Sequence, residues 1–116
     1  MAATHDLTGL RRGNSFERLF RFKDGAGQPV DLMGSEIVFI AETATSTIRK
    51  TTADDSLQMP SPTSGEVTLK LTPAETRLFA VGRLRSRYEI ERRIGDSEET
   101  LVSGCVVVEE GINDDA

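Results

Sequence analysis

The sequence predicts an all-β fold, an antiparallel, immunoglobulin-like β-sandwich of about seven to eight strands with one short helical turn. Three observations lead to this prediction: apolar residues recur at every second position, turn-forming residues interrupt the alternation at short intervals, and no segment has the strand–helix–strand spacing of a parallel sheet. The immunoglobulin comparison is architectural only, because the chain has one cysteine and no tryptophan and so lacks the Cys, Trp and Cys framework of antibody domains.

Length and composition fit one globular domain. The chain has 116 residues, 28% charged and 37% hydrophobic, which suits one modest core and is short for two domains. We expect a flexible N-terminal arm over residues 1–12, the β-sandwich over residues 13–110 and a flexible acidic tail over residues 111–116. We expect synthesis in a cytosol, because no apolar run resembles a signal peptide or a membrane span and a lone Cys105 cannot form an internal disulfide.

The first half of the chain predicts two strands joined by a turn. In residues 15–23 the phenylalanines share one face, which is the pattern of a half-buried strand. Residues 24–27 tolerate positive φ and Pro29 restricts its own φ, so the chain should turn there. In residues 36–42 both faces are apolar, so this strand is either central in a sheet or covered by a partner.

The second half predicts further strands and the helical turn. The expected strands are residues 47–51, 56–59, 66–71, 83–91 and 100–109, with a loop at 60–65 and a turn at 94–97. Thr72, Pro73 and Glu75 form a helix-start signature, so a short helical turn should follow as far as Phe79.

The side chains that alternation places on the inner faces of these strands predict the core. Its expected members are Phe16, Phe20, Phe22, Leu32, Ile37, Phe39, Val67, Leu69, Leu71, Leu84, Tyr88, Ile90, Val102, Val106 and Val108. Ile48 should also point inward, and Gly104 should leave a gap in the last strand.

The residue types that carry chemistry are sparse. His5, the only histidine, lies in the expected arm, and Cys105 lies in a predicted strand, so we expect neither a Ser-His-Asp nor a Cys-His arrangement. The acid pairs at residues 54–55 and 114–115 are typical of solvated loops, and residues 25–27 form a turn rather than a phosphate cradle. We therefore expect no enzyme, no metal, no cofactor and no small-molecule substrate.

Charge also limits the partners. The net charge of −5 argues against nucleic-acid and membrane binding, both of which usually need a basic excess. The densest basic stretch consists of Arg83, Arg85, Arg87, Arg92 and Arg93. The segment after residue 94 is acidic and has no lysine or arginine. We favour pairing of these charges across a sheet over a contact between subunits, and we place nucleic-acid binding third.

Turn and cap motifs follow one another in a recognisable order. They are Gly13-Asn14-Ser15-Phe16, Lys23-Asp24-Gly25, Pro29-Val30-Asp31-Leu32-Met33-Gly34, Ile37-Val38-Phe39, Gly65-Glu66-Val67, Leu71-Thr72-Pro73-Ala74-Glu75-Thr76, and Gly82-Arg83 with Tyr88-Glu89-Ile90. This order resembles the small β-sandwich virion proteins of tailed bacteriophages and prophages, in particular the N-terminal domain of phage baseplate upper proteins. The resemblance implies a symmetric building block of a tail, baseplate, neck or head surface.

The expected function is therefore structural: an oligomeric adaptor of the tail, baseplate or neck of a virion that is assembled in the bacterial host cytoplasm. Its partners would be other virion proteins and further copies of the chain. Two alternatives stay open, a head decoration or fibre-base protein and a small carbohydrate-binding sandwich module. The second is disfavoured because sugar sites usually present aromatic platforms, and the chain has no tryptophan and one tyrosine.

Alternation leaves apolar side chains on the outer faces, with arginines beside them. The predicted interface residues are Leu19, Val38, Ile40, Arg85, Arg87, Leu101 and Val107. A contiguous apolar patch usually marks a protein interface, which copies in a closed ring would cover. Alternatively, residues 43–50 or residues 2–10 of the same chain fold over the patch.

Overall fold

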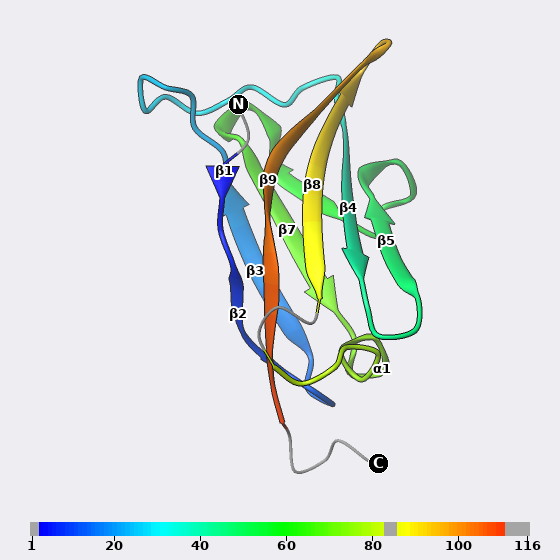
Figure 1. The fold of residues 1–116 in the computed structure, drawn as a ribbon. Helices are drawn as coiled ribbons and strands as arrows, with labels where there is room; N and C mark the ends of the chain where they lie inside the picture. The colour runs from blue at the N-terminus through cyan, green and yellow to red at the C-terminus, as the bar shows by residue number, and fades with distance from the viewer. Residues whose placement is uncertain (1–2, 83–85, 111–116) are drawn as a thin grey trace.

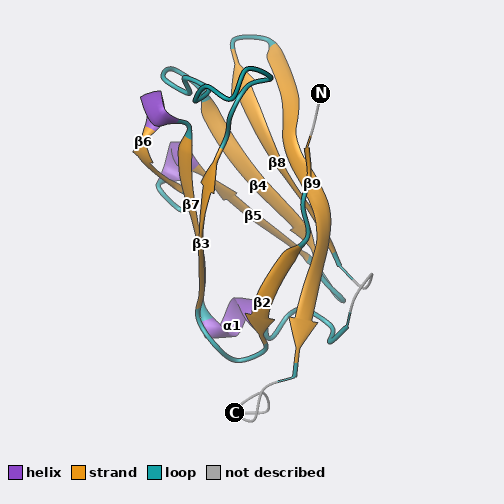
Figure 2. Cartoon of the chain, turned by 90° about the vertical axis from the view of Figure 1, so that its left-hand side faces the viewer, coloured by secondary structure: helices purple, strands orange, loops and turns teal. Residues whose placement is uncertain are grey.

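Two facing β-sheets make up the computed structural model, which describes residues 3–82 and 86–110 (Figures 1 and 2). The strands are β1 (Ala3–Thr4), β2 (Leu7–Arg11), β3 (Phe16–Arg21), β4 (Glu36–Glu42), β5 (Thr47–Thr51), β6 (Gln58–Ser61), β7 (Glu66–Leu71), β8 (Arg87–Ile94) and β9 (Ser97–Glu109). The helical elements are α1 (Pro73–Thr76) and single 3₁₀ turns at Thr52–Asp54 and Pro62–Ser64. The all-β sandwich with one short helix is confirmed.

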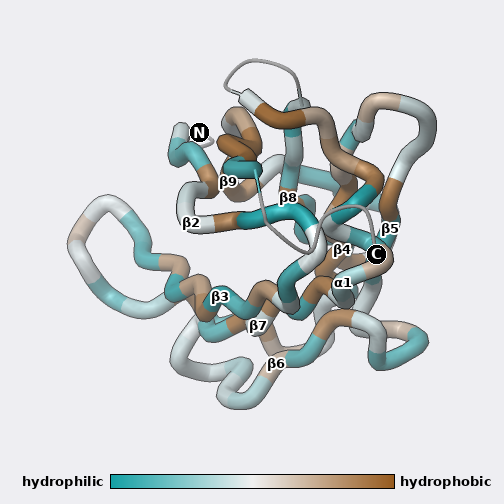
Figure 3. The backbone as a smooth tube through the Cα atoms, turned by 90° about the horizontal axis from the view of Figure 1, so that it is seen from below, coloured by the Kyte–Doolittle hydropathy of each residue, from teal (hydrophilic) through white to brown (hydrophobic). Residues whose placement is uncertain are grey.

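The strands divide into a larger and a smaller sheet. The larger sheet has the order β1-β9-β8-β4-β5, with β2 also paired to β9, and the smaller sheet has the order β3-β7-β6. Figure 3 looks at the molecule from below and shows β3, β7 and β6 on one side of the interior and β9, β8 and β4 on the other. The predicted bounds of β4, β5 and β7 agree with the structure, and Pro60 is tolerated in β6 because β6 is an edge strand.

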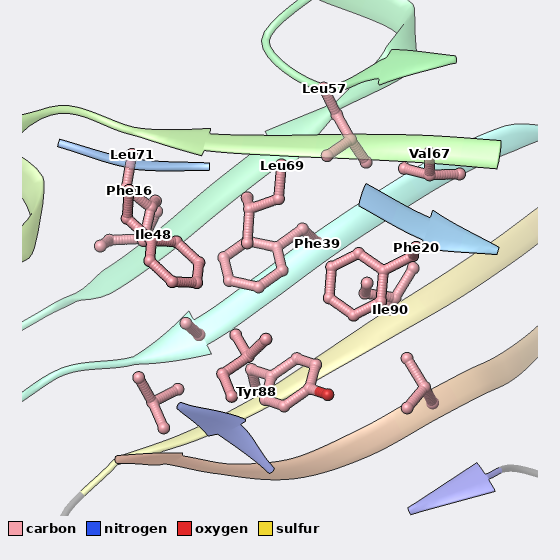
Figure 4. Packing of buried hydrophobic residues seen from close by; sticks show 14 of the residues in the cluster. Phe16, Phe20, Phe39, Ile48, Leu57, Val67, Leu69, Leu71, Tyr88 and Ile90 are labelled. Carbon is pink, nitrogen blue, oxygen red and sulfur yellow. The ribbon is translucent and has the colours of Figure 1, made fainter. Parts of the chain in front are cut away.

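The core lies between the sheets and closely follows the prediction (Figure 4). Phe39 is fully buried in the middle of β4, and its ring stacks on Tyr88 with the centroids 6.0 Å apart. Phe22 is only half-buried, because β3 ends at Arg21 and Phe22 packs at the margin of the cluster. The predicted Leu84 lies outside the described residues. The alternation missed the buried side chains of Leu7, Leu10, Leu57 and Phe79.

The expected flexible arm over residues 1–12 is wrong for the residues that the structure describes. β1 and β2 pair in parallel with β9, and Leu7 and Leu10 are fully buried. These leucines are three residues apart, so regular alternation would place them on opposite faces. Gly9 resolves this, because its φ of 82° coincides with a register shift between Leu7 and Leu10 that turns both side chains inward.

The predicted gap at Gly104 is occupied by the N-terminal segment. A Cβ atom at Gly104 would lie 2.3 Å from the carbonyl oxygen of His5, so only glycine permits this approach. The hydroxyl of Tyr88 donates a hydrogen bond to the same carbonyl, and the N–H of His5 donates to Ser103 at 2.9 Å. Gly104 and Tyr88 thus hold the N-terminal segment against β9.

Helix α1 closes one end of the sandwich. Its capping box is formed as predicted, with the Thr72 hydroxyl accepting from the N–H of Glu75 and the Glu75 carboxylate accepting from the N–H of Thr72. The helix is shorter than predicted and ends at Thr76. The fully buried Thr76 hydroxyl accepts from the N–H of Gly13 and donates to the carbonyl of Asn14, each at 3.0 Å, which fixes the start of β3.

Candidate functional site

The predicted interface residues do not share one surface. Leu19 is exposed on the outer face of β3 in the smaller sheet, whereas Ile40 and Val107 are half-buried in the larger sheet. Arg87 is exposed at the start of β8, and Arg85 lies outside the described residues. The described members therefore do not form one continuous apolar patch.

Val38 is not available for a contact, because its side chain is fully buried within its own chain. Its neighbours across the larger sheet are Thr51 and Glu91. The Thr51 hydroxyl donates to Glu36 at 2.6 Å, and the Glu91 carboxylate lies 3.1 Å from Arg93. These bonded side chains flank Val38 on the outer face of β4 and account for its burial.

Leu101 also departs from the predicted phase. Ile90 pairs with Val102 and Glu91 pairs with Thr100, so Leu101 is the extra residue of a β-bulge. A bulge shifts the alternation, and Leu101 packs against the core. It is therefore not an interface residue of the predicted patch.

Neither of the two segments considered as covers folds over the outer face. β5 lies beside β4 as the last strand of the larger sheet, and β1 and β2 lie beside β9 at the opposite edge. Both segments extend the sheet, because their backbones pair with the neighbouring strand. The half-buried Ile40 and Val107 remain on this face.

The predicted pairing of the arginine stretch across the sheet is confirmed at its C-terminal end. Arg92 lies 3.7 Å from Glu99 and Arg93 lies 3.5 Å from Glu98. The hydrogen bond to Glu91 raises the pKa of Arg93 above its ordinary value, and burial opposes this. These charges form ladders between β8 and β9, where they satisfy one another.

The residues considered for catalysis and metal binding do not converge among the described residues. The side chain of His5 is exposed, and Cys105 is half-buried with its backbone N–H donating to Asp6 at 3.0 Å. Within residues 3–82 and 86–110, no group of three or more His, Cys, Asp or Glu side chains could hold a metal ion. No helix in this part of the chain is long and apolar enough to cross a membrane.

A cleft of about 280 Å³ opens at one edge of the sandwich, between β1 and β3. Its walls include the apolar Ala3, Phe20, Phe22 and Val102 and the basic Arg18 and Arg21. Phe20 and Phe22 stack with their ring planes within 4° of each other, which gives the cleft a flat apolar wall. We call this feature the edge cleft.

Arg18 is the basic residue that alternation places inside the sandwich. It lies between Phe16 and Phe20 on the inward face of β3, with its guanidinium carbon 5.4 Å from the centre of the Phe16 ring. It donates a hydrogen bond to the carbonyl of Thr8 at 2.8 Å and has no carboxylate partner among the described residues. Arg18 was not among the predicted site residues, although its position between two inward phenylalanines indicates that it points toward the interior.

Tyr88 lies close to Phe20 of the cleft, and burial and nearby charges shift its pKa. Burial, together with the negative charge of Asp6, raises the pKa of Tyr88 to about 12, and the positive charge of Arg18 opposes this shift. The phenol is therefore neutral at physiological pH and serves as a hydrogen-bond donor to His5. It is a structural group rather than an acid or base.

Exposed apolar side chains lie at the two ends of the sandwich. The loop before β4 and the β8–β9 turn lie at the same end of the sandwich (Figure 1). Met33, in this loop, is 59% exposed, and Ile94, at the end of β8, is 44% exposed. Arg92 joins the loop to the hairpin at this end, because it donates to the carbonyl of Asp31 at 3.2 Å. At the end with α1, Leu78 and Val81 are 38% and 40% exposed.

Comparisons with known proteins do not identify a family for this chain. No protein-family model matches the sequence, and no curated protein matches it. Among solved structures, a candidate glycoside hydrolase from Bacteroides vulgatus ATCC 8482 is similar over 92% of this chain, with 10% sequence identity and a TM-score of 0.43. The match spans only 16% of the length of that protein. At this similarity it supports no conclusion about function.

Proposed function

We propose that this chain is a structural protein of a tailed-phage or prophage virion, an oligomeric adaptor of the tail, baseplate or neck. The observation that carries this proposal is the presence of exposed apolar side chains at both ends of the sandwich: Met33 and Ile94 at one end and Leu78 and Val81 at the other. An adaptor contacts one neighbour at each end, and apolar side chains that its own chain leaves uncovered suit such contacts.

The outer sheet faces contrast with the ends. On the smaller sheet, Arg21 lies 3.1 Å from Glu66 and Lys70 lies 3.9 Å from Glu17. On the larger sheet, the arginines at the end of β8 pair with glutamates of β9. Paired charges of this kind are typical of solvated faces, which supports contacts at the ends rather than on the faces.

The motifs that carry the phage resemblance also meet in space. Gly13 and Asn14 belong to the first motif and Thr76 to the helix motif, more than sixty residues later in the chain. The Thr76 hydroxyl binds the backbone of both, and this joint sets the start of β3 against α1. The two motifs therefore act together in this fold, where they join the start of β3 to α1.

The aromatic residues favour this proposal over the carbohydrate-binding alternative. Phe16, Phe20, Phe39, Phe79 and Tyr88 are buried. Phe22, the remaining aromatic residue, is half-buried. Phe20, whose ring stacks on Phe22 in the edge cleft, is only 8% exposed, so these side chains do not offer a flat exposed platform to a sugar ring.

A complementation experiment tests the proposal. The coding sequence is deleted from the phage or prophage genome that carries it, and particles are examined by electron microscopy after induction. We expect incomplete particles, restored by the wild-type chain and by Leu19→Ser, an exposed apolar residue on a sheet face. The double variant Met33→Ser and Ile94→Ser should not restore them, although its thermal unfolding should match that of the wild type. Complete particles from the deletion strain would contradict the proposal.

A further inference from the structure

The edge cleft lies beside an unpaired strand edge. Within residues 3–82 and 86–110, β3 pairs only with β7, so in this part of the chain the other edge of β3 presents backbone N–H and C=O groups without a partner strand. Arg18 reaches across this edge, where its side chain donates a hydrogen bond to the carbonyl of Thr8. Such an edge can accept an added strand, which gains affinity from backbone hydrogen bonds and specificity from alternate side-chain pockets.

The cleft defines the chemistry of the strand that would fit. The apolar wall of the cleft, formed by Phe20, Phe22 and Val102, favours an apolar side chain on the added strand. Arg18, which is half-buried and has no acidic partner among the described residues, favours a carboxylate, because a guanidinium forms its strongest hydrogen bonds with a charged acid. The fitting segment is therefore extended and carries an aliphatic and an acidic side chain on the same face.

The chain itself contains such a segment beyond β9. Residues 111–116 read Gly-Ile-Asn-Asp-Asp-Ala, with Ile112 and Asp114 two positions apart. Phe20 and Arg18 are also two positions apart on the inward face of β3. Residues two apart in a strand point to the same side with about 6.6 Å between them, so the two pairs match in spacing.

We propose that residues 111–116 of one copy add as an antiparallel strand to the free edge of β3 in a second copy, with Ile112 against Phe20 and Asp114 bound to Arg18. In this register Asp115 faces away from the cleft and lies near Glu17. Asp114 and Asp115 therefore have different roles although they are adjacent and chemically identical.

Chain length favours a second copy over the same copy. Ile112 is three residues beyond Glu109, so it lies at most about 10 Å from it. The ring of Phe20 lies 6.4 Å from that of Tyr88, and Tyr88 pairs with Gly104, which is five residues before Glu109 along β9, a distance of about 17 Å in a strand. A contact from the C-terminal segment of one copy to the cleft of the next is heterologous, and contacts of this type build rings or filaments.

The test is self-association of the purified full chain, measured by sedimentation velocity over a range of concentrations. We expect concentration-dependent oligomers of the wild type. Asp114→Asn should weaken self-association about tenfold, because a hydrogen bond to a charged partner is lost. The matched control Asp115→Asn should change it by less than about twofold. A synthetic peptide of residues 109–116 should dissociate the wild-type oligomer, and a scrambled peptide should not.

A second pair of variants tests the cleft that would bind the C-terminal segment. Arg18→Gln should weaken self-association as Asp114→Asn does. Arg49→Gln should not, because Arg49 is exposed on β5, at the far edge of the larger sheet and outside the cleft. Asp114 follows the last described strand in the sequence, so its variant tests the contact even if Arg18→Gln lowers stability. A monomeric wild type, or equal effects of Asp114→Asn and Asp115→Asn, would overturn the inference. Self-association in solution does not depend on the virion role, so either proposal can fail alone.

Discussion

Substitution of Gly104 by alanine should detach the N-terminal segment from β9. The added Cβ atom would lie 2.3 Å from the carbonyl oxygen and 2.8 Å from the carbonyl carbon of His5, distances that real contacts do not reach. The backbone of His5 must therefore move, and its bonds to Ser103 and Tyr88 weaken. Overpacking costs about 1–3 kcal/mol, and a buried hydroxyl left without its acceptor costs about 1–3 kcal/mol more.

We therefore expect Gly104→Ala to lower the free energy of unfolding by about 2–6 kcal/mol. In urea this corresponds to a midpoint lower by about 1–3 M for a domain of this size. Gly25→Ala is the matched control, because nothing lies within 4 Å of its added Cβ atom, and it should stay within about 0.5 kcal/mol of the wild type. Equal midpoints for the two variants would refute the packing of residues 3–11 on β9.

Three further predictions concern the core, the joint at α1 and the dependence of stability on pH. Phe39→Ala should cost about 3–5 kcal/mol in urea unfolding, because Phe39 is fully buried, and a loss below about 1 kcal/mol would contradict its place in the core. Thr76→Val should cost about 1–3 kcal/mol by removing the bonds to Gly13 and Asn14, whereas Thr68→Val on β7 should be nearly neutral; equal costs would contradict the joint. Burial alone would raise the pKa of Glu75, but hydrogen bonds from Lys50 and Thr72 outweigh burial and lower this pKa below its ordinary value of 4.5. Because the folded pKa is the lower one, this stabilisation is present above pH 4.5 and is lost as the pH falls through the folded pKa. The stability difference between wild type and Lys50→Met should therefore shrink in acid, and a difference independent of pH would count against the pair.

The sequence predicted most of the fold because strand alternation is a strong signal where strands are regular. β4, β5 and β7 have the predicted bounds, and Phe39 and Tyr88 lie where their phase places them. The N-terminal strands were missed because their buried leucines are three residues apart, a spacing that needs the bulge at Gly9. A pattern with period two cannot show an irregularity of this kind before the pairing partner is known.

The candidate site was less predictable, because burial of a surface position depends on neighbouring strands. Val38 reads as an outer-face residue, and it is buried by side chains from β5 and β8. Leu101 changes face through a bulge that is visible only in the pairing of β8 and β9. Arg18 was readable from its phase, but the absence of an acidic partner among the described residues appears only in three dimensions.

Quantitative mass spectrometry of purified particles tests the central claim most directly. Particles are prepared by induction of the strain that encodes the chain and are separated from the soluble lysate on a density gradient. The account predicts peptides of this chain in the particle fraction, at a fixed ratio to the other tail or neck proteins across preparations. Recovery of the chain only from the soluble fraction, alongside complete particles, would contradict the virion assignment.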